Sequence, residues 1–201
     1  MVGASACRAL AVAAACFSVA LASLQTARTR RTVAISAAAY AVLYVIMRSS
    51  TFLQPAAGTI SAKEAAEWRA RVISTVNAIL ISYGAAQCYS EWSDFNPASE
   101  GWVLASREAV QLSSVNLYGA MLIGYLSWDL CWVVWHHHAT PDISGAVHHI
   151  LFLSIAHYNM WGSYVLKAYA WTSAAEVSTP FLNARWFLAT LSRKEARRGE
   201  S

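Results

Sequence analysis

The residues best suited to chemistry in this sequence are its histidines, which all lie within one short stretch. Imidazole can act as a base, as an acyl-carrying nucleophile or as a metal ligand near neutral pH. Two of them, His148 and His149, are expected to open an apolar segment, so that one side chain can point into a helix bundle; we interpret this pair as candidate catalytic residues. The triplet His136, His137 and His138 could form a solvated cluster at a helix end, and His157 is the last of the six histidines.

A metal site is the weaker interpretation of the same cluster. Adjacent side chains on a helix diverge by about 100°, and none of the known helical metal motifs with spaced histidines is present. The cysteines are scattered without a C-x-x-C pair, so neither a zinc site nor a disulfide framework is indicated. We expect buried free thiols at Cys7, Cys16, Cys88 and Cys131. The sequence therefore predicts no metal and no cofactor.

Asp129 is the most unusual acidic residue, because it lies inside the apolar stretch GYLSWDLCWVVW. Ionisable residues at membrane depth are costly and usually face a bundle interior, a cavity or a partner. On a helix, Asp129 shares one face with Tyr118, Tyr125 and His136. Two interpretations remain open: Asp129 acts with the histidine pair as a third candidate catalytic residue, or it only holds the bundle together by a hydrogen bond to a neighbouring helix.

Long apolar segments determine the class of protein that must position these residues. Apolar residues make up 57% of the chain and charged residues only 13%, against about 25% charged in soluble domains. A helix needs about 20 mostly apolar residues to cross a bilayer. Five segments approach that length: residues 5–24, 33–52, 72–89, 116–135 and 149–170. We predict an all-α, multi-pass transmembrane helix bundle of about five to six spans, in which residues 180–191 could start a sixth helix but are too short to cross fully. The first segment can alternatively be a secretory signal peptide.

Basic residues cluster beside the predicted spans and account for the net charge of +4. Counting spans, we expect the clusters at residues 28–31 and 193–198 to lie together on the cytoplasmic side. A second group flanks the loop that would then face the other way: Arg48, Lys63, Arg69 and Arg71. Because the basic residues do not interleave with aromatic residues on one surface, we expect no nucleic-acid partner.

The chain contains one main helical domain and no internal repeat. We divide it into N-terminal spans and a basic loop over residues 1–53, the main domain over residues 60–191 and a charged tail over residues 192–201, which is expected to fray. Ser61 and Glu64 have the spacing of a capping box, which predicts a helix start. Residues 91–114 read as a polar loop with a short helix near 103–112.

Four sequence blocks resemble the TLC-domain family, which includes ceramide synthases and the TLC domain-containing proteins that regulate lipids. EWRARVISTVNAIL resembles the family's entry into a span, and GYLSWDL resembles its G-Y-x-x-Y-D-L segment. AVHHILFLSIAHYNMWGS resembles the paired-histidine block, and AAEVSTPFLNARWFL resembles the E-x-S-T-P-F-x-N-x-R-W-F stretch of TLC domain-containing proteins. Together the blocks cover roughly residues 60–190, and the last is the most specific.

The resemblance implies a ring of transmembrane helices around a lipid-sized cavity. It also implies residence in an internal membrane such as the endoplasmic reticulum, with the plasma membrane as an alternative. His148 and His149 match the pair that ceramide synthases use in acyl transfer, for which acyl-CoA would be the co-substrate. The expected polar residues of the lipid cavity are Asn77, Tyr125, His136, Glu176 and Arg185.

The departures from the family pattern favour a function without catalysis. Where ceramide synthases carry a second block, H-D-x-x-D, this chain reads KAYAWTSAAE and keeps only Glu176, for which Arg185 is a plausible ion-pair partner. Asn77 stands where many relatives have histidine, and the chain ends before two further family spans. We therefore expect a truncated sequence, or an open ring completed by a partner subunit or a second copy. The predicted function is to bind membrane lipids or regulate phospholipid composition; the alternative is an acyltransferase that uses His148 or His149.

Overall fold

The computed structural model describes residues 26–49, 60–91, 114–136, 143–162 and 173–199, and these ranges are almost entirely helical. The predicted all-α fold is confirmed, and no strand occurs in these ranges. The first apolar segment at residues 5–24, the polar loop with its helix near 103–112, and His137 and His138 lie outside the described residues. The elements are α2 (Ala27–Ser49), α3 (Ala62–Glu91), α6 (Ser114–His136), α7 (Ile143–Gly162), the short 3₁₀ turn η1 (Ala175–Ser178) and α9 (Thr179–Gly199).

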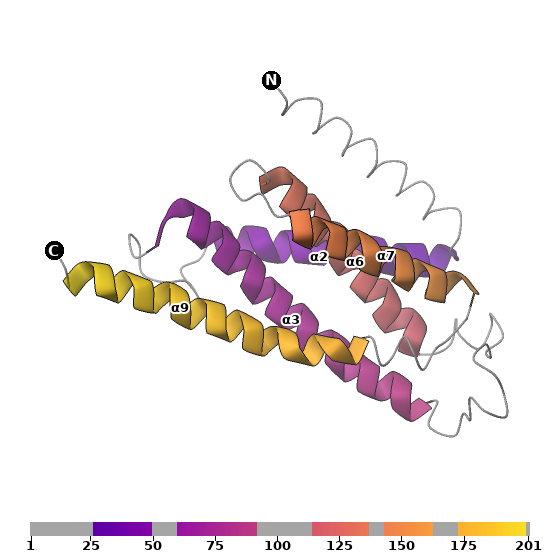
Figure 1. The fold of residues 1–201 in the computed structure, drawn as a ribbon. Coiled ribbons are helices and arrows are strands. Elements are labelled where there is room, and N and C mark those ends of the chain that lie inside the picture. Colours follow the sequence, from indigo (N-terminus) through magenta and orange to yellow (C-terminus); the bar gives the residue numbers. More distant parts are fainter. Residues whose placement is uncertain (1–25, 50–59, 92–113, 137–142, 163–172, 200–201) are drawn as a thin grey trace.

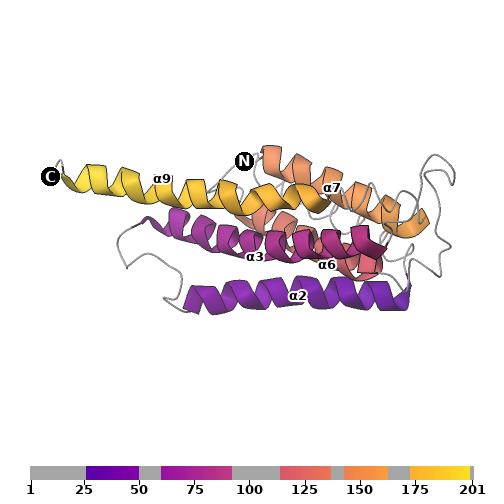
Figure 2. The ribbon, with the colours of Figure 1, turned by 90° about the horizontal axis from the view of Figure 1, so that it is seen from below.

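The helices form three layers that place α3 and α6 in the middle. Figure 2 shows α2 on one side of this pair and α7 with α9 on the other. The packing is consistent with a membrane bundle, since α2 and α6 are long and apolar enough to cross a bilayer and α7 contains the shorter apolar stretch Gly145–His157. Large apolar side chains remain exposed along α2, as expected of a surface that faces lipid: Ile35, Val42, Val45 and Ile46.

Successive described helices alternate in direction (Figure 1). The α2 and α6 helices run parallel, because Thr29 donates to Asn116 at 2.9 Å near the start of both and Ser36 donates to the Met121 carbonyl at 3.0 Å further along both. The intervening α3 runs the opposite way, with Asn77 accepting from the Tyr40 hydroxyl at 3.0 Å. The last helix, α9, packs antiparallel to α3, where the rings of Phe187 and Trp68 lie 4.3 Å apart.

The alternation corrects the predicted placement of the basic clusters. Residues 28–31 begin α2 and residues 193–198 end α9, and the five described helices between these points change direction at every step. An odd number of alternating helices puts the two clusters at opposite ends of the bundle, so the expectation that they share one side is wrong. The tail cluster instead lies at the end that also carries Arg48, Lys63, Arg69 and Arg71, which we call the basic end.

Helix boundaries differ from the limits of the apolar segments, because the first and last helical turns can be polar. The capping box at the start of α3 is confirmed: the Ser61 N–H donates to the Glu64 carboxylate at 2.9 Å, and the Ser61 hydroxyl accepts from the Glu64 N–H at 3.2 Å. The α7 helix begins at Ile143, so the histidine pair lies inside it and does not open it. Residues 192–199 continue α9 and do not form a frayed tail. Cys88 is buried as expected, whereas Cys131 is exposed.

Two glycines allow the layers to approach closely. A Cβ atom at Gly124 of α6 would lie 2.6 Å from the Ser36 Cβ and 2.7 Å from the Val33 carbonyl oxygen of α2. A Cβ atom at Gly84 of α3 would collide with the ring of Tyr118. Small residues at such crossings are typical of membrane helices, where close backbone approach supplies the packing energy.

Candidate functional site

The candidate site begins with three side chains from α6 and α7. The Tyr125 hydroxyl donates to Oδ2 of Asp129 at 2.9 Å, one helical turn along α6. The same oxygen lies 2.9 Å from Nε2 of His149 on α7, and the two side chains of this pair are only 13% and 14% exposed. On the far side of the imidazole ring, Nδ1 lies 3.0 Å from the Gly145 carbonyl oxygen. Asp129 therefore joins α6 to α7, and a carbonyl one turn earlier orients the histidine.

The geometry restricts where the protons of this group can be. A carbonyl oxygen only accepts hydrogen bonds, so the Nδ1 atom of His149 carries a hydrogen. The Nε2 atom then either donates to an ionised Asp129 as part of an imidazolium, or accepts from a protonated Asp129. In both forms, each ring nitrogen of His149 is already engaged by a protein oxygen.

The pair lies at the edge of a pocket of about 400 Å³ between the middle layer and the layer of α7 and α9. We call this the His149 pocket. It combines acidic, basic and amide side chains from four helices. Its lining consists of Lys63, Glu67, Ala70, Arg71 and Ser74 of α3, Asp129, Trp132 and Val133 of α6, His149 of α7 and Asn183 of α9.

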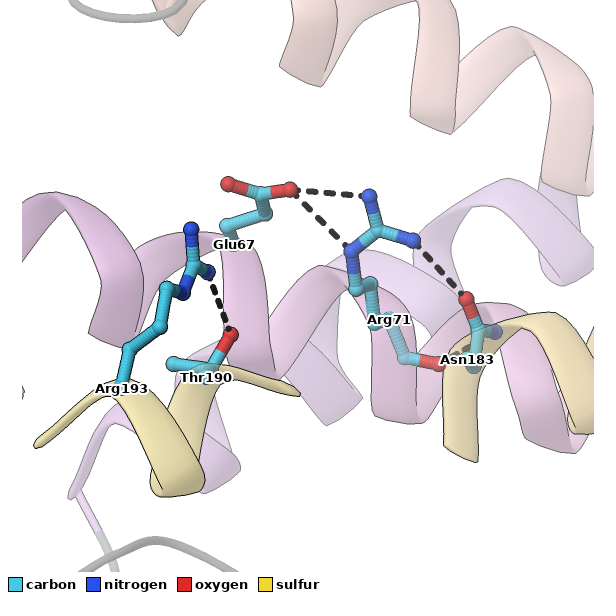
Figure 3. Close-up of polar contacts among 5 residues, drawn as sticks. All are labelled: Glu67, Arg71, Asn183, Thr190 and Arg193. Atoms are coloured by element: carbon cyan, nitrogen blue, oxygen red, sulfur yellow. Dashed lines mark hydrogen bonds and ion pairs between the residues drawn. The ribbon is translucent and has the colours of Figure 1, made fainter. Parts of the chain in front are cut away.

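The opposite wall of the His149 pocket is a second polar network, which attaches α9 to α3 (Figure 3). Arg71 donates from Nε and Nη2 to one carboxylate oxygen of Glu67, at 3.1 and 2.9 Å. Its Nη1 donates to the side-chain oxygen of Asn183 at 3.1 Å. The Asn183 amide in turn donates to the Arg71 carbonyl at 3.1 Å and to the Thr75 hydroxyl at 3.0 Å. The buried Asn183 thus fixes the register of α9 and the orientation of the Arg71 guanidinium.

Comparison with known proteins agrees with this helical arrangement. The TLC domain matches residues 67–199, which include α6, α7, α9 and most of α3, the four helices that line the His149 pocket. The chain belongs to the TLC-domain family. It is 30% identical over 145 residues to TLC domain-containing protein 4-B of Danio rerio, covering 72% of this chain and 51% of the relative. It is 29% identical over 143 residues to TLC domain-containing protein 4 of Homo sapiens, covering 71% and 51%. The chain therefore spans about half the length of these relatives, and no solved structure was found to match it.

The side chains of the two adjacent histidines in this TLC-domain protein point in different directions. His149 faces the pocket and Asp129, whereas His148 is exposed, with its ring 4.4 Å from that of Phe152 on α7. Neighbouring positions on a helix point about 100° apart, so only one member of the pair can face the middle layer. Of the two histidines singled out from the sequence, the structure brings only His149 together with Asp129.

Of the residues predicted to line a lipid cavity, only some lie near the His149 pocket. Tyr125 belongs to the Asp129 group, but His136 stacks on Trp132 at 4.4 Å and lies on the other side of the middle layer. Asn77 is fully buried between α3 and α2, where it accepts from Tyr40 and lines neither of the two pockets described here. Its side-chain nitrogen has no hydrogen-bond partner among the described residues.

Glu176 and Arg185 do not form the ion pair that their spacing suggested. The Glu176 carboxylate accepts from the Thr179 hydroxyl at 3.0 Å, which places it at the start of α9. Arg185 is exposed on that helix, and neither residue lines the His149 pocket. Pro180 follows η1 in the first turn of α9, so the chain continues into a helix and does not fold back to bring the two charges together.

Five polar residues of the pocket were not predicted from the sequence as site residues: Lys63, Glu67, Arg71, Ser74 and Asn183. A signal for some of them was present, because Glu67 and Arg71 lie in the EWRARV block and Asn183 lies in the STPFLNARWF block. Each block could be recognised in the sequence, but the contact between Arg71 of α3 and Asn183 of α9 could not. Among the described residues, no three His, Cys, Asp or Glu side chains gather closely enough to hold a metal ion.

Proposed function

We propose that this TLC-domain protein binds the headgroup of a zwitterionic phospholipid in the His149 pocket and acts in membrane lipid homeostasis without transferring an acyl chain. The proposed location is an internal membrane such as the endoplasmic reticulum. The observation that carries the proposal is the engagement of both ring nitrogens of His149 by Asp129 and by the Gly145 carbonyl.

A catalytic histidine held by a carboxylate normally keeps its second nitrogen for the reacting atom. In this protein the second nitrogen donates to the backbone of its own helix. The imidazole is therefore suited to holding α7 against α6 and to shaping a polar wall, and poorly suited to removing a proton from a substrate.

The charges of the His149 pocket favour a ligand that carries both signs. Lys63 and Arg71 are balanced by Glu67 and Asp129, so a net anion gains little from the pocket as a whole. Lys63 is exposed and forms no ion pair with any described residue, which leaves its ammonium for a phosphate. The two hydrogen bonds from Arg71 to Glu67 reach the same carboxylate oxygen. Figure 3 shows the other oxygen of Glu67 pointing away from Arg71, where it can accept from a lipid amine.

The depth of the pocket agrees with a headgroup site. Asp129 lies seven residues before the end of α6, which is about 10 Å at the rise of an α-helix. Phospholipid headgroups occupy this interfacial region of a bilayer. A volume of about 400 Å³ is at the small end of ligand pockets and suits a polar headgroup whose chains remain in the membrane.

An acyltransferase remains the second candidate, because the contact between His149 and Asp129 is also the arrangement that would orient a catalytic imidazole. In that case His149 would have to release the Gly145 carbonyl when acyl-CoA binds. The two functions make different predictions for the same protein preparation.

The deciding experiment uses the full chain in phosphatidylcholine and phosphatidylethanolamine nanodiscs, with His149→Ala, Lys63→Gln and the exposed His148→Ala as the matched control. Bound lipids are measured by native mass spectrometry, and labelled acyl-CoA is then added. We expect Lys63→Gln to lower lipid retention severalfold, His148→Ala to retain it, and no variant to form a labelled acyl lipid.

A labelled product that disappears in His149→Ala but persists in His148→Ala would establish acyl transfer and refute the proposal. Equal lipid retention by the wild type and Lys63→Gln would also refute it, because the phosphate would then have another partner. Circular dichroism of each variant confirms that the helices are intact.

A further inference from the structure

A second pocket lies on the opposite side of the middle layer, between α2, α3 and α6. Its volume is about 500 Å³, and we call it the Arg69 pocket. Trp132 lines both pockets and forms the wall between them. The pocket is made mostly of basic and aromatic side chains: Tyr44 and Arg48 of α2, Ala66 and Arg69 of α3, and Trp128, Cys131, Trp132, Trp135 and His136 of α6.

The charge of the Arg69 pocket differs from that of the His149 pocket. Two arginines line it, and no carboxylate is among its described lining residues. Arg48 is exposed in the last turn of α2 and makes no hydrogen bond or ion pair with the described residues. The pocket therefore attracts an anion, whereas the charges of the His149 pocket are balanced.

Aromatic side chains hold the basic residues in place. The Arg69 guanidinium lies over the ring of Tyr44, 5.6 Å from its centre, a geometry that stabilises a cation. Tyr44 in turn packs against Trp128 at 6.0 Å. His136 is oriented by Nδ1, which lies 3.0 Å from the Trp132 carbonyl, and by stacking on the Trp132 ring.

The surroundings of the pocket are those of a membrane interface. It lies where α2 and α6, the two helices long enough to span a bilayer, reach their ends. Trp135 is 84% exposed at its rim, and tryptophan is enriched at the level of lipid headgroups. Val45 lies one turn before Arg48 on the same face of α2 and is exposed, so an apolar surface leads from the pocket towards the membrane interior.

We propose that the Arg69 pocket binds the phosphate of an anionic phospholipid, with Arg48 and Arg69 as its partners and the acyl chains along the exposed apolar face of α2. A soluble phosphate would meet the same two guanidinium groups, but it would gain nothing from that apolar face or from Trp135. This site is separate from the zwitterionic site of the proposed function and does not depend on it.

The test uses the full chain in nanodiscs of phosphatidylcholine that contain a minor fraction of phosphatidylglycerol, with retained lipids measured by native mass spectrometry. We expect the wild type to enrich phosphatidylglycerol. Arg48→Gln should lower this enrichment about fivefold, and Arg48→Gln with Arg69→Gln roughly 25-fold, the effect expected of basic residues near a lipid surface. The matched control is Arg28→Gln with Arg31→Gln, which removes the same charge at the other end of the bundle and should retain the enrichment.

Further measurements keep the result interpretable. Because Arg69 packs on Tyr44, its loss can weaken the fold; the exposed Arg48→Gln tests the site without that risk, and Arg48→Lys should recover most of the enrichment. An equal loss in the control pair would overturn the proposal in favour of diffuse surface charge. Displacement of phosphatidylglycerol by inorganic phosphate at millimolar concentration would assign the pocket to a soluble anion. Lys63→Gln should leave this enrichment unchanged, which separates this test from that of the His149 pocket.

Discussion

The pairing of Asp129 with His149 predicts a strong energetic coupling between α6 and α7. The carboxylate and imidazole lie 2.9 Å apart with side chains 13% and 14% exposed. Removing one partner of a buried pair costs about 3–5 kcal/mol, because the other is left without its counter-group. Since both side chains retain some exposure, we expect about 3 kcal/mol for His149→Ala. Asp129→Ala should cost about 1 kcal/mol more, because the Tyr125 hydroxyl also loses its acceptor.

The double variant should be far less destabilised than the sum of the two single variants. Once both groups are absent, neither is left buried without a partner, so we expect a total of about 4 kcal/mol and a coupling energy of about 3 kcal/mol. Unfolding in mixed micelles, followed by circular dichroism during titration with sodium dodecyl sulfate, gives the four free energies of the cycle. His148→Ala is the control and should change stability by less than about 0.5 kcal/mol. Additive single effects would show that the two side chains do not interact in the folded protein and would refute the reasoning.

Two further predictions concern the packing of the outer layers. Gly124→Ala should lower the stability of the bundle by about 1–3 kcal/mol despite the better helix propensity of alanine, because the added methyl group collides with Ser36 and the Val33 carbonyl. Thermal unfolding in detergent measures this loss of stability. Adding Ser36→Gly should restore only part of it, since the Val33 carbonyl stays in place. Asn183→Ala should release α9 from α3 at a cost of about 2–3 kcal/mol, because it removes a buried amide with three hydrogen bonds and leaves Arg71 one acceptor short. The expected result is faster amide hydrogen exchange in α9 and unchanged exchange in α2, and an equal increase in both helices would contradict it.

Much of the fold followed from patterns that are local in the sequence. Charge-free apolar stretches determine that the chain is helical and lies in a membrane, because a buried peptide backbone in lipid must satisfy its hydrogen bonds within a helix. The capping box at Ser61 and Glu64 is equally local and predicted the start of α3. The pairing of Tyr125 with Asp129 could be expected from helical spacing, since residues four apart share a face.

The sequence was less informative about where each helix begins and which end of the bundle each charge occupies. Apolar runs mark the part of a helix that lies in lipid, whereas backbone hydrogen bonding continues into polar turns, as at the start of α7 and the end of α9. The position of the tail cluster depended on whether α9 adds one more change of direction to the bundle. The sequence predicted only a short helical start at residues 180–191, because the turns that follow it are charged, whereas α9 continues to Gly199.

Only the tertiary structure decided which residues meet in the two pockets. The sequence identified the TLC-domain resemblance, the histidine pair and Asp129, but both members of the pair carry the same chemistry, and their difference comes from the 100° turn between neighbours on a helix packed on one side. Glu67, Arg71 and Asn183 come together only because α9 runs antiparallel to α3 in a single register. Arg48, Arg69 and His136 likewise lie far apart in the chain and meet because α2 and α6 end at the level where α3 begins. Contacts between helices depend on crossing, register and rotation, and these are set by the packing of whole side-chain surfaces and by no single motif.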